Sequence, residues 1–149
     1  MRGLWLFVHL SGMAMWLGGG MASMVSGVVA KKMAPAERLA VYKALGAVHR
    51  VLVRSGAIAV VLSGVFLFLP MMRGAPQWVN MMMGAGIVGA VVAAAFSVPT
   101  ATALGRLELD PRGELPESFA RLRKRQAIVA TIAGALAILA LMAGTIFRG

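Results

Sequence analysis

Cysteine is absent from this 149-residue sequence, and its absence excludes disulfide bonds, thiolate metal sites and thiol catalysis. Acidic residues are scarce, because only five Asp and Glu stand against fifteen Lys and Arg. All five lie outside the long apolar segments, so neither paired catalytic carboxylates nor a carboxylate proton relay inside a membrane is expected. The HExxH and P-loop motifs are also missing, and the residues point to no enzymatic reaction.

Charged residues make up 13% of the chain and hydrophobic residues 60%. A soluble domain carries charge on about a quarter of its residues, so this composition is typical of a membrane protein. Four apolar segments reach the ~20 residues that a helix needs to span a bilayer, and none alternates as a transmembrane strand does. We therefore predict an all-α fold, an integral membrane four-helix bundle of two antiparallel hairpins. A single domain covers residues 1–149, with helices at about 4–30, 36–69, 78–104 and 117–147.

The basic residues are concentrated in two places. Twelve of the fifteen Lys and Arg lie in or beside the segments that join the first helix to the second and the third to the fourth. Short loops rich in Lys and Arg stay in the cytoplasm, so both termini are predicted to face the periplasm or cell exterior. Topology and anionic lipid account for the net charge of +10, so no nucleic-acid partner is expected. The first segment exceeds the ~7–15-residue core of a signal peptide and is expected to remain in the protein.

Small residues recur at helical spacing within the predicted helices, as at Gly19, Ser23 and Gly27. Helices in lipid associate by close backbone approach, which small residues permit. These stripes predict a tight bundle and would also suit contacts with further chains. The expected partners are therefore the lipid bilayer and either a homo-oligomer or other membrane subunits.

One histidine lies inside the first apolar segment, in HLSGMAMWLGGG at residues 9–20. Polar side chains within a membrane are costly and normally face the bundle. Helical spacing puts the histidine on one face with a methionine and a tryptophan, and the predicted topology places three consecutive methionines of the third helix at similar depth. His9 is the expected metal ligand of this site. The candidate cofactor-binding residues are His9, Met13, Trp16, Met81, Met82 and Met83.

Three interpretations of this site stay open. A histidine and a methionine on facing helices can ligate haem iron, so the first is haem b or a related tetrapyrrole. An imidazole with several thioethers also suits Cu(I), so the second is copper. In the third, His9 only hydrogen-bonds a backbone carbonyl or Asn80, and the methionines fill space.

The second histidine, His49, is expected at the opposite, cytoplasmic end, too far from His9 to ligate the same iron. An interfacial or structural role is predicted for it. Arg50 and Arg54 follow on one helix face and are expected to contact lipid phosphate or cofactor propionates. Snorkelling of their guanidinium groups to the interface is the simpler explanation.

His9 followed, after six residues, by Trp16-Leu17-Gly18-Gly19 resembles the opening helix of the CopD/HemJ-like group of small bacterial four-helix membrane proteins. The segments SGVFLFL at 63–69, RLRKRQ at 121–126 and ALMAGT at 140–145 are similar too. The resemblance implies that His9 binds haem and that any enzymatic activity is that of a haem-dependent oxidoreductase. HemJ-like proteins carry a lysine in the third helix that this chain lacks, so the resemblance does not extend to protoporphyrinogen oxidase activity.

These observations lead to one functional hypothesis and two alternatives. The hypothesis is a bacterial inner-membrane protein that binds haem b or a related tetrapyrrole through His9, for electron transfer or tetrapyrrole handling. The first alternative is a structural accessory subunit of a larger membrane complex, without chemistry of its own. The second is copper handling at the outer face.

Overall fold

The computed structural model describes residues 1–146, and every regular element in that range is helical. Four continuous spans are long and apolar enough to cross a membrane, which confirms the predicted all-α fold with four such helices. The expected end of the last helix, at residue 147, lies outside the described residues. The elements in chain order are α1 (Arg2–Val29), η1 (Ala30–Lys32), α2 (Pro35–Val48), η2 (His49–Val53), α3 (Arg54–Phe68), η3 (Leu69–Met71), α4 (Gln77–Val92), η4 (Ala93–Ser97), α5 (Val98–Leu104) and α6 (Glu117–Thr145).

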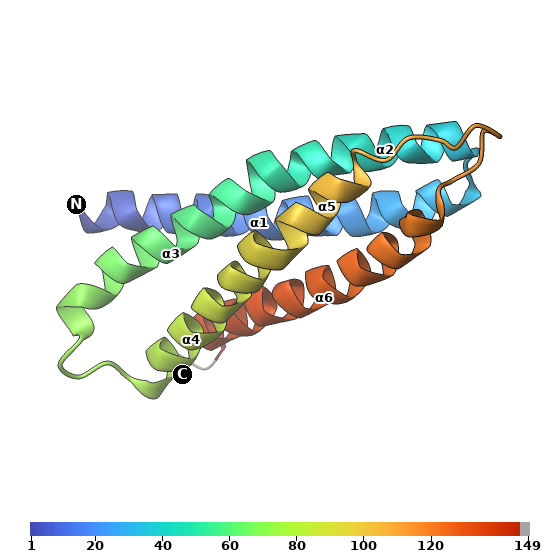
Figure 1. The fold of residues 1–149 in the computed structure, drawn as a ribbon. Helices are drawn as coiled ribbons and strands as arrows, with labels where there is room; N and C mark the ends of the chain where they lie inside the picture. Colours follow the sequence, from blue (N-terminus) through green and yellow to red (C-terminus); the bar gives the residue numbers. More distant parts are fainter. Residues whose placement is uncertain (147–149) are drawn as a thin grey trace.

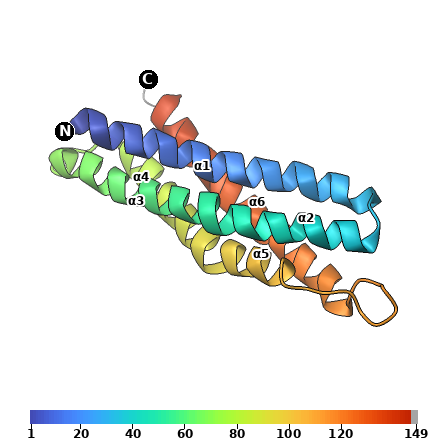
Figure 2. The ribbon, with the colours of Figure 1, turned by 90° about the horizontal axis from the view of Figure 1, so that it is seen from above.

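Consecutive spans run antiparallel along a common bundle direction (Figure 1). α1 packs mainly on the α3 span and α4 mainly on α6, so the bundle consists of two closely packed pairs. α2 and α5 pack against each other and join the pairs at the end that holds the loops 30–34 and 105–116. We call this the basic end. The opposite end, where α1 begins and α6 finishes, is the terminal end (Figure 2).

Large apolar side chains remain exposed along the outer surface of the spans. In water such a surface would be unusual, since soluble monomers rarely expose contiguous apolar patches of more than a few hundred Å². A lipid environment accommodates it without cost. Examples are Phe7, Leu10 and Val25 on α1, Ile58, Leu62 and Phe66 on α3, Val88 and Val91 on α4, and Ile128, Ile132 and Ile138 on α6.

The backbones of α1 and α3 come into close contact at Gly12 and Gly56. A Cβ built on Gly56 would lie 2.7 Å from the Gly12 carbonyl oxygen and 2.7 Å from the Trp16 amide nitrogen. A Cβ on Gly12 would lie 2.9 Å from the Gly56 carbonyl oxygen. The two glycines therefore let the helices meet backbone to backbone, which is how helices gain dispersion energy in lipid.

Trp16 links this contact to the other helix pair. Its side chain is 3% exposed and packs on Gly89 of α4, where an added Cβ would lie 3.1 Å from the ring carbon Cη2. Small residues of η4 and α6, including Ala93 and Ala137, complete an apolar core with the ring. The small-residue stripes predicted from the sequence thus serve contacts inside this chain.

A second core lies at the basic end. Leu39, Tyr42 and Leu45 form the buried face of α2, as their helical spacing predicts, and they pack with Leu104 and Phe119. The Tyr42 and Phe119 rings meet edge to face, with centroids 5.2 Å apart. This core fixes the basic end independently of the core around Trp16.

Two spans contain a π-helical turn, η2 and η4, near the basic end. Pro99 is the second residue after η4 and has no N–H for the carbonyl four residues earlier. A π-turn is one way to absorb such a break. The sequence predicts a kink at Pro99, and the structure shows a π-turn ahead of it, with helical structure continuing through α5. No proline lies in or beside η2, so the sequence offers no comparable signal there.

We expect Gly56→Ala to lower the free energy of unfolding by about 1–3 kcal/mol, because the new methyl group meets rigid backbone atoms of α1. Gly18→Ala is the matched control, since a Cβ on Gly18 meets nothing within 4 Å. That control should be neutral or gain up to ~1 kcal/mol from helix propensity. Unfolding of detergent-solubilised protein by sodium dodecyl sulfate, followed by tryptophan fluorescence, measures both. Equal stabilities of Gly56→Ala and the native protein would contradict the backbone contact.

Candidate functional site

A cavity of about 600 Å³ lies at the terminal end, between α1, α3, α4 and α6. Its volume falls within the ~300–1,000 Å³ typical of cofactor and small-molecule sites. The lining is largely apolar, and the polar side chains on it include His9 of α1 and Arg2 at the start of the same helix. The cavity is therefore largely apolar, with the imidazole of His9 on its wall and the guanidinium group of Arg2 beside it.

Glycines from three helices keep this cavity open. A Cβ on Gly64 of α3 would lie 3.3 Å from the Cε1 atom of His9, and one on Gly144 of α6 would lie 2.9 Å from the Met82 sulfur. Gly86 of α4 also lines the wall. Side chains at these positions would press on the histidine and on a methionine, so the glycines give the cavity room for a flat ligand.

The His9 ring is held by its Nδ1 atom. Nδ1 lies 3.0 Å from the Val60 carbonyl oxygen and 3.1 Å from the Ser63 hydroxyl oxygen, both on α3. A carbonyl oxygen only accepts, and the Ser63 hydroxyl donates to the carbonyls of its own helix, so Nδ1 carries the proton and donates. The neutral ring then has its lone pair on Nε2, which bonds to no other described residue.

This arrangement is the usual one for a histidine that ligates a metal. Ligating histidines donate their other ring N–H to a carbonyl or carboxylate, which fixes the tautomer and the ring orientation. The sequence offered a backbone carbonyl or Asn80 as the hydrogen-bond partner of His9. The Val60 carbonyl confirms the first of these, with Ser63 beside it, whereas Asn80 is exposed. Ser63 is fully buried. Ser63 could have been identified from the sequence, because it is a polar residue in the middle of an apolar segment, at the depth of His9 on the facing helix.

The structure brings together four of the six predicted cofactor-binding residues. His9, Met13, Met82 and Met83 line the cavity. Trp16 lies outside its lining, in the core on Gly89. Met81 is also outside, because its position on α4 turns it outward, where it is 38% exposed.

The described residues contain no group of three or more His, Cys, Asp or Glu that could hold a metal ion. Any metal at this site would therefore rely on His9 with thioethers, or on a cofactor that carries its own donor atoms. A tetrapyrrole supplies four nitrogens to its metal and needs only one or two protein ligands. The donor set and the volume of the cavity fit such a group.

His49 occupies a second polar site, at the basic end. The sequence expected it at the membrane interface, whereas the structure buries it to 3% exposure. Its Nδ1 donates to the Leu45 carbonyl at 3.0 Å, and the Gln126 amide nitrogen lies 3.0 Å from its Nε2. The same amide nitrogen donates to the Ser97 hydroxyl at 2.9 Å, and Ser23 lies 3.4 Å from Nδ1.

This second cluster joins all four spans, because Ser23, His49, Ser97 and Gln126 come from α1, η2, η4 and α6. Both π-turns contribute a member. Both ring nitrogens of His49 are occupied, so it has no free lone pair to offer a ligand. The structural role predicted for His49 agrees with this geometry. Sequence reasoning missed Gln126, although a glutamine at the start of the apolar part of the last helix was a visible polar exception.

Arg50 and Arg54 line a separate groove at the basic end. They are thus remote from the His9 cavity, where Arg2 is the arginine in the lining. Cofactor propionates in that cavity would meet Arg2.

Comparison of the chain with protein-family models, with curated proteins and with solved structures finds no match. The resemblance to the CopD/HemJ-like group stays a prediction.

We expect Gln126→Met to lower the free energy of unfolding by about 1–2 kcal/mol, because a thioether of similar size leaves His49 Nε2 and the Ser97 hydroxyl without their donor. Ser55→Ala is the control, since the Ser55 hydroxyl is exposed and bonds only to Val51 of its own helix turn. The detergent unfolding measurement described above compares the two variants. Stability losses of equal size would show that the cluster is no more important than a surface hydroxyl.

Proposed function

We propose that this protein is a multi-pass membrane protein that binds haem b, or a related tetrapyrrole, through His9 in the cavity at the terminal end. The observation that carries the proposal is the state of the His9 ring. Its Nδ1 is hydrogen-bonded to Val60 and Ser63 on α3. Its Nε2 lone pair is therefore free to bind a ligand in the cavity that the side chain lines. Structural histidines normally use both nitrogens, as His49 does.

The remaining lining supplies what such a ligand would need. The apolar side chains of α1, α3, α4 and α6 would enclose the ring, and Gly64 and Gly86 would give its faces space. Met82 and Met83 of α4 are the candidates for a second axial ligand opposite His9. Arg2 would pair with propionate groups at the end of the cavity.

When bound, haem supplies one-electron redox chemistry at its iron. The protein's own part is to hold and orient the His9 ring, to exclude water with apolar side chains and to place a cation near negative groups. Electron transfer or handling of the tetrapyrrole follows from these properties. Among the described residues, no carboxylate lines the cavity beside His9, and we propose no further reaction.

Copper remains a second candidate, because one observation favours it. Met13, Met82 and Met83 share the cavity with His9, and thioethers with an imidazole suit Cu(I). A structural accessory subunit, alone or with further copies, would need no ligand in the cavity at all. The experiment below separates these outcomes.

We further propose that the basic end faces the cytoplasm of a bacterial inner membrane and that both termini face outward. Two facts support this orientation: α1 begins and α6 finishes at the same end, and the loops of the other end carry most Lys and Arg. The His9 cavity would then lie in the outer half of the membrane.

Purified protein titrated with haemin should develop a Soret band that His9→Ala abolishes. Ser63→Ala, which removes one partner of Nδ1, should keep the band and weaken haemin binding about 10-fold. Met82→Leu and Met83→Leu identify the second ligand. The variant that removes this ligand should convert a low-spin haem spectrum to a high-spin one. Met81→Leu is the control and should change nothing, because Met81 lies outside the cavity.

Each other result contradicts the haem proposal. A protein that stays colourless with haemin but retains Cu(I) through washing supports copper instead. A protein that retains neither is left with a structural role. Haemin binding that survives in His9→Ala would show that the tetrapyrrole sits elsewhere on this apolar protein.

The absence of cysteine makes the orientation directly testable, because single cysteines can be introduced without removing any. In intact cells, an impermeant maleimide should label Arg73→Cys, in the α3–α4 loop, and leave Arg112→Cys, in the α5–α6 loop, unlabelled. Permeabilised cells should label both. The reverse pattern in intact cells would invert the proposed orientation.

A further inference from the structure

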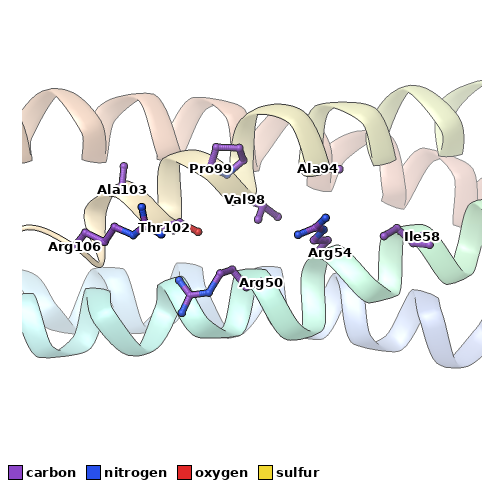
Figure 3. A pocket seen from close by; sticks show the side chains of 9 residues that line it. All are labelled: Arg50, Arg54, Ile58, Ala94, Val98, Pro99, Thr102, Ala103 and Arg106. Carbon is purple, nitrogen blue, oxygen red and sulfur yellow. The ribbon is translucent and has the colours of Figure 1, made fainter.

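A groove of about 620 Å³ runs along the basic end, between the second and third spans. Its walls are η2 and α3 on one side and η4 and α5 on the other. Figure 3 shows Arg50 and Arg54 reaching into it from the first wall and Arg106 facing them from the second. This groove is separate from the His9 cavity and shares no lining residue with it.

The two walls are brought together by backbone contact between α2 and α5. A Cβ on Gly46 would lie 3.0 Å from the Ala101 carbonyl oxygen, and one on Gly105 would lie 3.1 Å from the Tyr42 carbonyl oxygen. Gly46 precedes Arg50 by one helical turn, and Gly105 immediately precedes Arg106. The glycine contacts therefore fix two arginines, distant in sequence, on facing helices.

No protein anion balances the charge of these arginines. Among the described residues, none forms a hydrogen bond or ion pair with Arg50, Arg54 or Arg106. The five acidic residues lie at positions 37, 108, 110, 114 and 117, and none of them lines the groove. Three guanidinium groups that line one groove without a counter-ion among the described residues mark a place for an external anion, and planar guanidinium groups match phosphate oxygens in pairs.

The groove is basic at one end and apolar at the other. In Figure 3, Arg106 and Arg50 lie toward one end, Ala94 lies level with Arg54 on the facing wall, and Ile58 lies at the other end. Ile58 is 46% exposed, and Val98 adds a further apolar contact. Moving from Arg50 through Arg54 to Ile58 follows the α3 span toward its lipid-facing middle. A ligand that fits must therefore be anionic at one end and apolar at the other.

We propose that this groove is a binding site for an anionic phospholipid, with the phosphate held by Arg50, Arg54 and Arg106 and an acyl chain lying on Ile58, Ala94 and Val98. Basic pockets between membrane helices on the cytoplasmic side are suited to such headgroups. A free phosphate ion shares the headgroup chemistry but would leave the apolar half of the groove unused. The site is independent of the cofactor proposed for the His9 cavity.

Binding is measured by native mass spectrometry of the full chain in uncharged detergent, titrated with phosphatidylglycerol or with phosphatidylcholine. The native protein should retain phosphatidylglycerol in preference to phosphatidylcholine. Replacing all three arginines by glutamine (Arg50→Gln, Arg54→Gln, Arg106→Gln) should weaken phosphatidylglycerol binding about 100-fold, at about 5-fold for each basic residue. The matched control, Arg121→Gln with Lys124→Gln and Arg125→Gln, removes equal charge at the same end outside the groove and should change affinity by less than about 5-fold.

Two further arms test the source of the phosphate and the folding of the variants. Inorganic phosphate at millimolar concentration should not displace phosphatidylglycerol, and Ala94→Phe, which fills the apolar half, should weaken lipid binding while all arginines remain. The detergent unfolding curve without added lipid should be the same for both triple variants. Displacement by inorganic phosphate, equal losses in the two triple variants, or equal retention of phosphatidylcholine would each overturn the proposal.

Discussion

The contact between the backbones at Gly12 and Gly56 sets the geometry of the α1–α3 pair, on which the His9 site depends. Two helices in lipid gain nothing from hiding apolar surface, so close approach and dispersion must hold them together. At this crossing α1 and α3 approach until an added Cβ on Gly56 would lie 2.7 Å from the facing backbone. One helical turn from Gly12, Trp16 fills the space to Gly89 of α4. The cavity lies on the terminal side of this packed level and the polar cluster of His49 on the basic side.

The two histidines show how the same side chain takes different roles within one bundle. His49 lies among Leu45, Ser97 and Gln126 and forms hydrogen bonds with both ring nitrogens, so its imidazole serves as a connector between helices. His9 has hydrogen-bond partners on α3 only, and the wall opposite offers methionines and glycines in place of donors. A free lone pair beside an apolar cavity is costly to keep without a use. This contrast, more than the presence of histidine, distinguishes a candidate ligand from a structural residue.

The long apolar runs and the charge distribution predict the helices well, because length and hydropathy are properties of each segment alone. The buried face of α2 at Leu39, Tyr42 and Leu45 follows from spacing for the same reason. Sites between helices are harder to predict, since they depend on rotation about each helix axis. Trp16 and Met81 are close in sequence to cavity residues, yet rotation turns one into the core and the other outward. No proline lies near the π-turn η2 to indicate it in the sequence, and His49, which begins this turn, is buried between the helices.

The packed level around Trp16 also separates the chemistry of the two ends. Ala93 and Ala137 are fully buried and pack with Trp16, Met13 and Val60 in one apolar core, and burying a charge in such a core carries a large desolvation cost. A ligand in the His9 cavity must then enter from the terminal end or sideways from lipid. The three arginines line only the groove at the basic end. The two proposed sites therefore share helices but no lining residue, and the core around Trp16 lies between the two helix pairs that carry them.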